Sequence, residues 1–182
     1  MIATGSRLIA IDGINASALK TAARELAAAN RRHRAGISLW GASGIFDELS
    51  VAEAEAGTPS PRTLLLLYAA DLAFRLRWEI CPALEEGRLV IAAPYISTAV
   101  AFGQAAGLDP VWLTDLFHFA PAAAEHQLID PPPAKHRAER HGFVEFCWPH
   151  LEKRFGGLTR LQLMDRTQRH LRATARRRMS AV

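Results

Sequence analysis

The stretch IAIDGINASALKT, residues 9–21, links an apolar run to a helix-forming run through a turn that contains one glycine. The apolar residues before the turn are numerous enough for a buried strand. The residues from 17 to 34, SALKTAARELAAANRRHR, are rich in strong helix formers. In open α/β sheets, ligands bind where strands end and such turns begin. We therefore predict that this turn lies beside any ligand site of the protein.

Strand and helix signals alternate in the same way over the rest of the 182 residues. The later predicted strands are GISLWGAS (36–43), RLVIAAPY (88–95) and HQLIDPPP (126–133). The later predicted helices lie at 60–87, 97–107, 109–120, 143–155 and about 166–179. Ser60 and Asp109, each followed by proline, are predicted N-caps, and Pro149 is expected to bend or interrupt its helix. This alternation predicts an α/β fold, a three-layer αβα sandwich around a parallel sheet of about five strands, in a single domain over residues 1–182.

The composition is that of an ordinary globular protein, with 49% hydrophobic and 22% charged residues. The two cysteines, Cys81 and Cys147, have no spacing typical of a metal site and are expected to be reduced thiols. No segment has the pattern of a signal peptide or the length of a membrane span. The sequence therefore predicts a cytoplasmic protein that binds neither a metal nor a membrane.

The formal charge of +4 is concentrated near the C-terminus. The arginines of this segment are Arg166, Arg169, Arg172, Arg176, Arg177 and Arg178. They suit a solvated terminal helix with cations at the negative end of its dipole. An acidic partner bound to this basic helix is the alternative. Nucleic acid is not expected as a partner, because no aromatic residues alternate with these arginines.

Three blocks of the sequence resemble bacterial thymidylate kinases: SPRTLLLLYAAD (60–71), GLDPVWL (107–113) and LIDPPP (128–133). The family has SPRTELLLYAAD, GLDPEWL and LDVPPE at these places, and the similarity runs from about residue 6 to residue 133. The resemblance implies the fold of a P-loop nucleoside monophosphate kinase. A shared fold does not establish a shared activity, so the residues that phosphoryl transfer requires have to be compared one by one.

The family's phosphate-binding loop reads approximately EGIDGSGKST, and residues 12–21 align with it without a gap. Two glycines of the family loop are alanine in this chain, and Leu19 stands in the place of its lysine. Lys20 stands where the family has the hydroxyl residue that meets magnesium. A Cβ atom in place of those glycines hinders the approach of backbone N–H groups to phosphate. The alternative is a one-residue bulge that brings Lys20 and Thr21 into the register of a working loop.

The resemblance assigns vestigial or possible nucleotide contacts to a set of residues in two regions. In the loop they are Asp12, Gly13, Asn15, Ser17, Lys20 and Thr21, of which Asp12, Lys20 and Thr21 hold vestigial catalytic positions. For the base they are Tyr68, Asp71 and Phe102, with the two aromatic rings placed to stack on a pyrimidine. The alternative for Tyr68 and Phe102 is a place in the hydrophobic core.

Further charged positions of the family are missing from this chain. The family has an Asp-Arg pair at the end of the third strand, where this chain has Ala93-Pro94. The family also has an arginine after Asp71, where this chain has Leu72. The lid segment, about residues 133–142, is much shorter than in the family. Each lost cation or metal ligand contributes orders of magnitude to the rate of phosphoryl transfer. No cofactor is therefore expected, and ATP with Mg²⁺ is expected only if the loop is rearranged into a working form.

The helix from Ser60 to Trp78 takes part in the family's homodimer, and in this chain it is more apolar. Its predicted interface residues are Leu64, Leu65, Leu67, Leu72, Phe74 and Trp78. The alternative is deeper burial of this helix in its own core. These features favour a catalytically degenerate, dimeric protein that serves as a binding, scaffold or regulatory subunit. An active nucleoside monophosphate kinase that uses Lys20 and Thr21, and a non-catalytic nucleotide sensor, are the alternatives.

Overall fold

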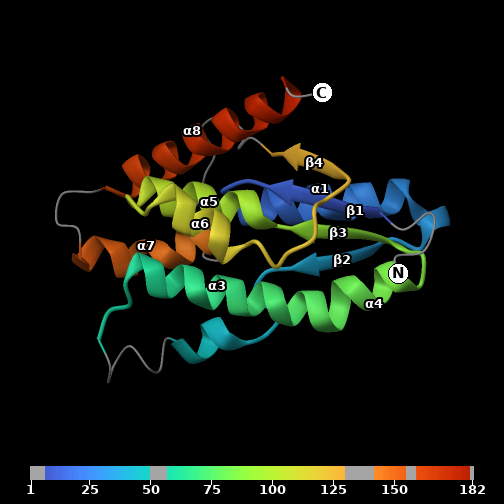
Figure 1. Cartoon of the computed structure of the whole chain (residues 1–182), viewed down its shortest axis with the longest axis horizontal. Coiled ribbons are helices and arrows are strands. Elements are labelled where there is room, and N and C mark those ends of the chain that lie inside the picture. Colours follow the sequence, from blue (N-terminus) through green and yellow to red (C-terminus); the bar gives the residue numbers. More distant parts are fainter. Residues whose placement is uncertain (1–6, 50–56, 130–141, 155–158, 181–182) are drawn as a thin grey trace.

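The computed structural model describes residues 7–49, 57–129, 142–154 and 159–180. Its strands are β1 (Arg7–Asp12), β2 (Gly36–Leu39), β3 (Leu89–Ala93) and β4 (Glu125–Leu128). Its helices are α1 (Ala16–Ala29), η1 (Arg31–His33), α3 (Pro61–Arg75), η2 (Leu76–Ile80), α4 (Cys81–Glu85), α5 (Ile96–Ala105), α6 (Pro110–Leu116), α7 (Phe143–Arg154) and α8 (Arg160–Met179). The predicted alternation of strands and helices is confirmed (Figure 1).

The strands form one parallel sheet in the order β2-β3-β1-β4. In the register of the two central strands, Ile9 lies opposite Ile91. All of β3, and β1 beyond Arg7, is buried, as expected for strands covered on both faces. The described part of the chain contains four strands, close to the predicted five.

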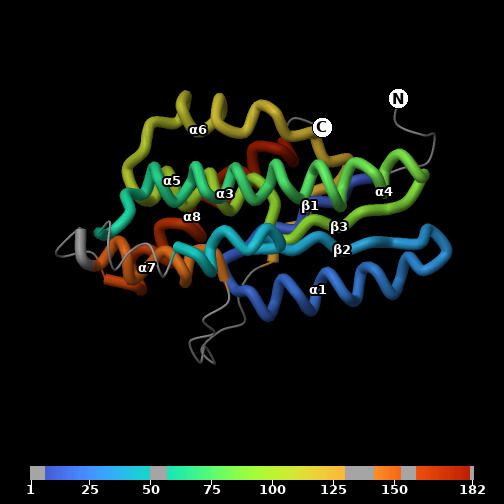
Figure 2. Tube along the Cα trace, turned by 90° about the horizontal axis from the view of Figure 1, so that it is seen from below, coloured from blue at the N-terminus to red at the C-terminus, as the bar shows by residue number. Residues whose placement is uncertain are grey.

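Helices cover both faces of the sheet, which gives the predicted three layers (Figure 2). On one face Leu19 and Ala23 of α1 pack against Ile9, Ile11 and Ile91. On the other face a larger core joins the sheet to α3, α4, α5, α7 and α8. The αβα sandwich follows from this division, because each strand sends alternate side chains into each core.

The predicted helix at 60–87 is continuous, with a π-helical turn, η2, between α3 and α4. The Ser60 side chain accepts a hydrogen bond from the Thr63 amide, and the Asp109 side chain accepts one from the Trp112 amide, so both predicted N-caps are confirmed. Helix α7 continues through Pro149, where the sequence led us to expect a bend or a break.

Helix α8 begins at Arg160, earlier than the predicted residue 166. Thr159 explains the earlier start, because its side chain accepts from the Gln162 amide while the Gln162 side chain accepts from the Thr159 amide. The predicted short lid, about residues 133–142, lies outside the described residues except for Gly142. No helix in the described part of the chain is long and apolar enough to cross a membrane.

Candidate functional site

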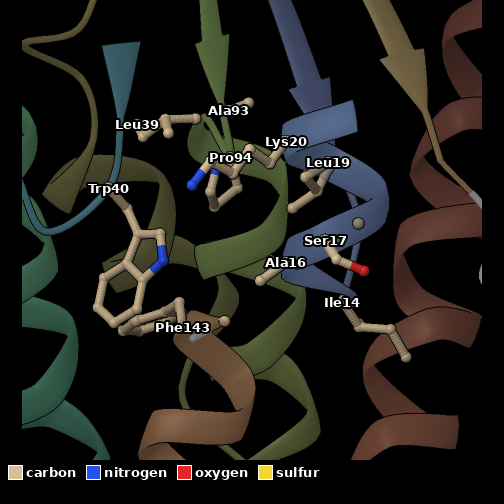
Figure 3. Close-up of a pocket in the computed structure, with 12 residues that line it drawn as sticks. Ile14, Ala16, Ser17, Leu19, Lys20, Leu39, Trp40, Ala93, Pro94 and Phe143 are labelled. Atoms are coloured by element: carbon tan, nitrogen blue, oxygen red, sulfur yellow. The ribbon is translucent and has the colours of Figure 1, made fainter. Parts of the chain in front are cut away.

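A cavity of about 300 Å³ lies at the carboxyl edge of the sheet, where ligands bind in folds of this kind. It is bounded by the β1–α1 turn, the ends of β2 and β3, and the start of α7 (Figure 3). The described residues that line it are Gly13, Ile14, Ala16, Ser17, Leu19, Lys20, Leu39, Trp40, Ala93, Pro94, Gly142 and Phe143.

Asn15 ends the β1–α1 turn and caps α1, which begins at Ala16. The Asn15 Oδ1 atom accepts from the Ala18 amide at 2.9 Å and from the Ser17 hydroxyl at 3.2 Å. The Asn15 carbonyl accepts from the Leu19 amide at 3.0 Å. Helix N-termini that bind phosphate present such amides to the ligand. Two amides at this N-terminus are thus already hydrogen bonded within the chain.

The backbone at Gly142 also lies close to this helix start. A Cβ atom added to Gly142 would lie 3.3 Å from the Ile14 carbonyl oxygen and 3.5 Å from the Ala16 nitrogen. Gly142 is buried there. The main chain before α7 therefore lies against the turn that the resemblance assigns to phosphate.

Leu19, which aligns with the family's lysine, is 3% exposed and packs in the core beneath α1. Lys20 is exposed, and its side chain extends from α1 across the cavity toward Pro94 (Figure 3). Thr21 is exposed and is not among the described residues that line the cavity. Lys20 and Thr21, predicted together as an alternative loop pair, thus differ in their access to the site.

Asp12, at the end of β1, is 4% exposed and holds the start of α5. Its Oδ1 atom accepts from the Tyr95 amide at 3.1 Å, and from the amide and the hydroxyl of Thr98 at 2.9 and 2.8 Å. The Thr98 hydroxyl also accepts from the Gly13 amide at 3.0 Å. Asp12 and Gly13, both predicted nucleotide-loop residues, therefore tie β1 to α5.

The end of β3 is fixed from the core side by two residues of α3. The Tyr68 hydroxyl donates to the carbonyls of Tyr95, at 2.5 Å, and Pro94, at 3.1 Å. Arg75 donates through Nη1 to the Pro94 carbonyl at 3.3 Å. Burial raises the pKa of Tyr68, so its hydroxyl keeps the proton that it donates. The strand end that carries Ala93-Pro94 is therefore anchored to α3.

Asp71 and Arg75 form a fully buried ion pair, with Nε of Arg75 3.0 Å from Oδ2 of Asp71. Asp71 also accepts from the Gly41 amide at 3.1 Å, and from the amide and hydroxyl of Ser43 at 3.1 and 2.8 Å. This predicted base-site residue thus holds the turn after β2. The sequence analysis did not identify Arg75, although its spacing of four residues from Asp71 permits a helical ion pair.

Tyr68 and Phe102, the two rings expected to stack on a base, are both fully buried. The Phe143 ring of α7 is tilted against Tyr68 with centroids 4.5 Å apart, and meets Phe102 edge-on at 5.2 Å. Phe143 also meets Trp40 and Phe46 at 5.8 and 6.2 Å. The two predicted base-stacking rings thus pack in the core against Phe143, which the sequence analysis did not identify.

The predicted interface residues of α3 and η2 divide into two groups. Leu64, Leu65 and Leu72 have no exposed surface and belong to the chain's own core, in agreement with the alternative that the sequence left open for this helix. Leu67 is partly buried, while Phe74 is 39% and Trp78 is 63% exposed. The guanidinium of Arg77 lies over the Trp78 ring, 5.0 Å from its centroid. The spacing of apolar residues along a helix that is apolar on most sides does not show which side faces the core.

Magnesium with a nucleotide would need oxygen ligands at this edge of the sheet. Among the described residues that line the cavity, Ser17 has the one side-chain oxygen, and its hydroxyl donates to Asn15. Within the described ranges, no cluster of three or more His, Cys, Asp or Glu side chains could hold a metal ion. The described lining of the cavity therefore offers a magnesium–nucleotide complex one side-chain oxygen, that of Ser17, and no carboxylate.

Comparison with known proteins finds thymidylate kinases. A probable thymidylate kinase of Thermococcus gammatolerans is 40% identical over 93 residues, which are 50% of this chain and 40% of that protein. One of Pyrobaculum calidifontis is 29% identical over 147 residues, 76% of this chain and 75% of the relative. A thymidylate kinase of Nitratidesulfovibrio vulgaris is 32% identical over 111 residues, half of that protein's length. No family model matches the chain.

The fold comparison agrees with these relatives. The crystal structure of a thymidylate kinase from Ehrlichia chaffeensis superposes with a TM-score of 0.56 at 18% identity. The match covers 70% of this chain and 72% of that one. In sequence this chain is similar to thymidylate kinases over half or more of its length, and its fold is similar to that of a thymidylate kinase.

Proposed function

We propose that the chain is a catalytically inactive relative of thymidylate kinases that acts as a binding, scaffold or regulatory subunit. The observation that carries the proposal is the burial of Leu19 at the position of the loop lysine. Phosphoryl transfer depends on cations and metal ions placed around the phosphates. A leucine in the core supplies no charge, and Ala93-Pro94 supplies none at the second phosphate position.

Inactivity is tested by a coupled assay with ATP, Mg²⁺ and a panel of nucleoside monophosphates. We expect no turnover above background. Turnover that is lost in Lys20→Ala would support the second candidate function, an active kinase that uses Lys20. That candidate is favoured by one observation, the extension of the Lys20 side chain into the cavity.

A purely nucleotide-sensing role has less support. It requires a base between Tyr68 and Phe102, and both rings contact Phe143 in the buried core. A base would have to displace Phe143, which is 2% exposed. Calorimetric titration with thymidine and dTMP separates sensing from scaffolding, and we expect no heat of binding for either.

The same subunit is proposed to form a homodimer, or to bind another protein, through the exposed apolar side of α3 and η2. Leu66, Phe74 and Trp78 lie on this side and are 50%, 39% and 63% exposed. Exposed apolar clusters of this kind mark interaction surfaces. Sedimentation velocity tests the assembly, and a monomer at high micromolar concentration would contradict the homodimer.

The basic helix α8 is a second proposed interaction surface, for an acidic partner. Its seven arginines and one aspartate give it a formal charge of +6, while the rest of the chain carries −2. The last turn holds Arg176, Arg177 and Arg178. Binding of an acidic peptide that weakens with salt and is lost on truncation after Asp165 would support this role.

A further inference from the structure

The cavity beside α1 is lined mostly by apolar groups. Leu39, Trp40, Pro94 and Phe143 surround it, and together they offer large aliphatic and aromatic surfaces to a ligand (Figure 3). Its volume of about 300 Å³ is at the small end of the range for ligand pockets. This composition favours a small molecule with an apolar or aromatic body over a polyphosphate.

One cation reaches this apolar space. Lys20 is the only charged residue among the described residues that line the cavity. In the described part of the chain its ammonium has no hydrogen-bond or ion-pair partner, and no carboxylate belongs to the lining. A single unpaired cation beside apolar walls complements one negative charge.

Three backbone amides around this cation are already occupied and do not point freely into the cavity. The amides of Gly13, Ala18 and Leu19 already donate to Thr98 or to Asn15. A phosphate cradle instead needs several amides that converge on the anion. A carboxylate or sulfonate with one negative charge needs fewer donors and can be held by Lys20 alone.

From these observations we propose that the cavity binds a small monoanion with an apolar or aromatic body. The apolar part lies against Trp40, Leu39 and Phe143, and the acid group meets the Lys20 ammonium. This proposal rests on the proposed loss of nucleotide chemistry at the same edge of the sheet. It assigns to that edge a ligand class different from a nucleotide.

Naphthalene-1-acetate is the probe, and naphthalene-1-acetamide is its neutral match with the same apolar body. Calorimetry with the full chain should give a single site for the acetate, with Kd of about 1 mM or tighter. The acetate should bind about three- to tenfold tighter than the amide, because Lys20 is an exposed cation. In an NMR titration the Trp40 indole resonance should shift with the same Kd.

Two variants of α1 separate a charge contact from a general effect on the helix. In Lys20→Gln the preference for the acetate should disappear, while the amide should bind as before. In Arg24→Gln, which changes an exposed cation outside the described lining, the preference should remain.

The proposal is overturned by any of three results. These are no saturable binding of the acetate, an acetate preference that survives Lys20→Gln, or inorganic phosphate binding at least as tightly as the acetate. Kinase turnover on ATP would instead refute the proposed loss of catalysis. If the chain shows no turnover and does not bind the acetate, only the proposed ligand is refuted and the proposed loss of catalysis stands. The two proposals can therefore fail separately.

Discussion

The ring of Phe143 lies 4.5 Å, centroid to centroid, from the ring of Tyr68. The contact joins the start of α7 to α3 at the centre of the larger core. In Phe143→Ala the lost ring leaves a cavity, so the free energy of unfolding should fall by about 3–5 kcal/mol in urea titrations. Phe143→Leu should cost clearly less, because leucine refills part of the space. Equal stability of Phe143→Ala and the unmodified chain would contradict the central place of this ring.

A lysine at the aligned loop position should destabilise the fold without restoring phosphate binding. Leu19→Lys places an ammonium in a core that holds Ile9, Ile11 and Ile91, and should cost about 3 kcal/mol. Leu19→Met retains the apolar contacts and should cost less than about 1.5 kcal/mol. Urea unfolding measures the stability of both variants. Calorimetric titration measures whether they bind ATP. An Leu19→Lys variant that is stable and binds ATP would contradict this account of the loop.

Asp12 should matter for stability through its hydrogen bonds to α5. Asp12→Ala leaves the amides of Tyr95 and Thr98 without their acceptor, which should lower the free energy of unfolding by about 3 kcal/mol. Asp12→Asn retains an acceptor oxygen and should cost less. Hydrogen exchange of the Thr98 amide gives a second readout. An unchanged exchange rate in Asp12→Ala would show that the contact to α5 is not formed in solution.

Some of these contacts could be predicted from the sequence and others could not. Ser60 and Asp109 were predicted as caps because capping depends on residues within one turn. Asp12 and Gly13 were placed correctly at the strand end, but their partner Thr98 lies 85 or more positions away. Phe143 belongs to α7, which follows residues 130–141 in the sequence, and it packs against rings of α3 and α5. No local sequence pattern indicates such a contact. Contacts between distant segments were therefore missed, while local structure was predicted.

Stability should decrease on acidification, in part through His126. The pKa of His126 is lowered by burial and then by Arg178, whose Nη1 lies 3.0 Å from Nδ1 of the imidazole. An arginine can only donate, so this contact requires an unprotonated Nδ1. In the unfolded chain the imidazole binds a proton near pH 6.5, whereas in the folded chain it binds one only at lower pH. The free energy of unfolding therefore decreases as the pH falls below about 6.5.

His126→Asn tests this prediction by thermal unfolding between pH 8 and pH 5. The drop in Tm on acidification should be smaller in the variant than in the unmodified chain. His170→Asn is a useful comparison, because burial also lowers the pKa of His170, with contributions from Arg169 and Arg177. An identical pH profile for His126→Asn and the unmodified chain would contradict the coupling to Arg178.

A charged residue at Trp78 should dissociate the proposed homodimer. Trp78→Glu introduces a carboxylate on the exposed apolar side of α3 and η2, and burial of an unpaired charge is costly. Leu161→Glu on α8 is the matched control, because Leu161 is also a highly exposed apolar residue, at 79%. In sedimentation velocity, Trp78→Glu should shift the protein to monomer and Leu161→Glu should not. The same shift in both variants would rule out an interface at η2.

The most direct measurement of the central claim is nucleotide turnover by the unmodified chain. The coupled assay contains ATP, Mg²⁺ and dTMP or another nucleoside monophosphate, with Lys20→Ala measured alongside. With Leu19 buried at the loop lysine position, the account predicts the same background rate for both proteins. Turnover by the unmodified chain that is lost in Lys20→Ala would contradict it, and would identify a working kinase with a rearranged loop.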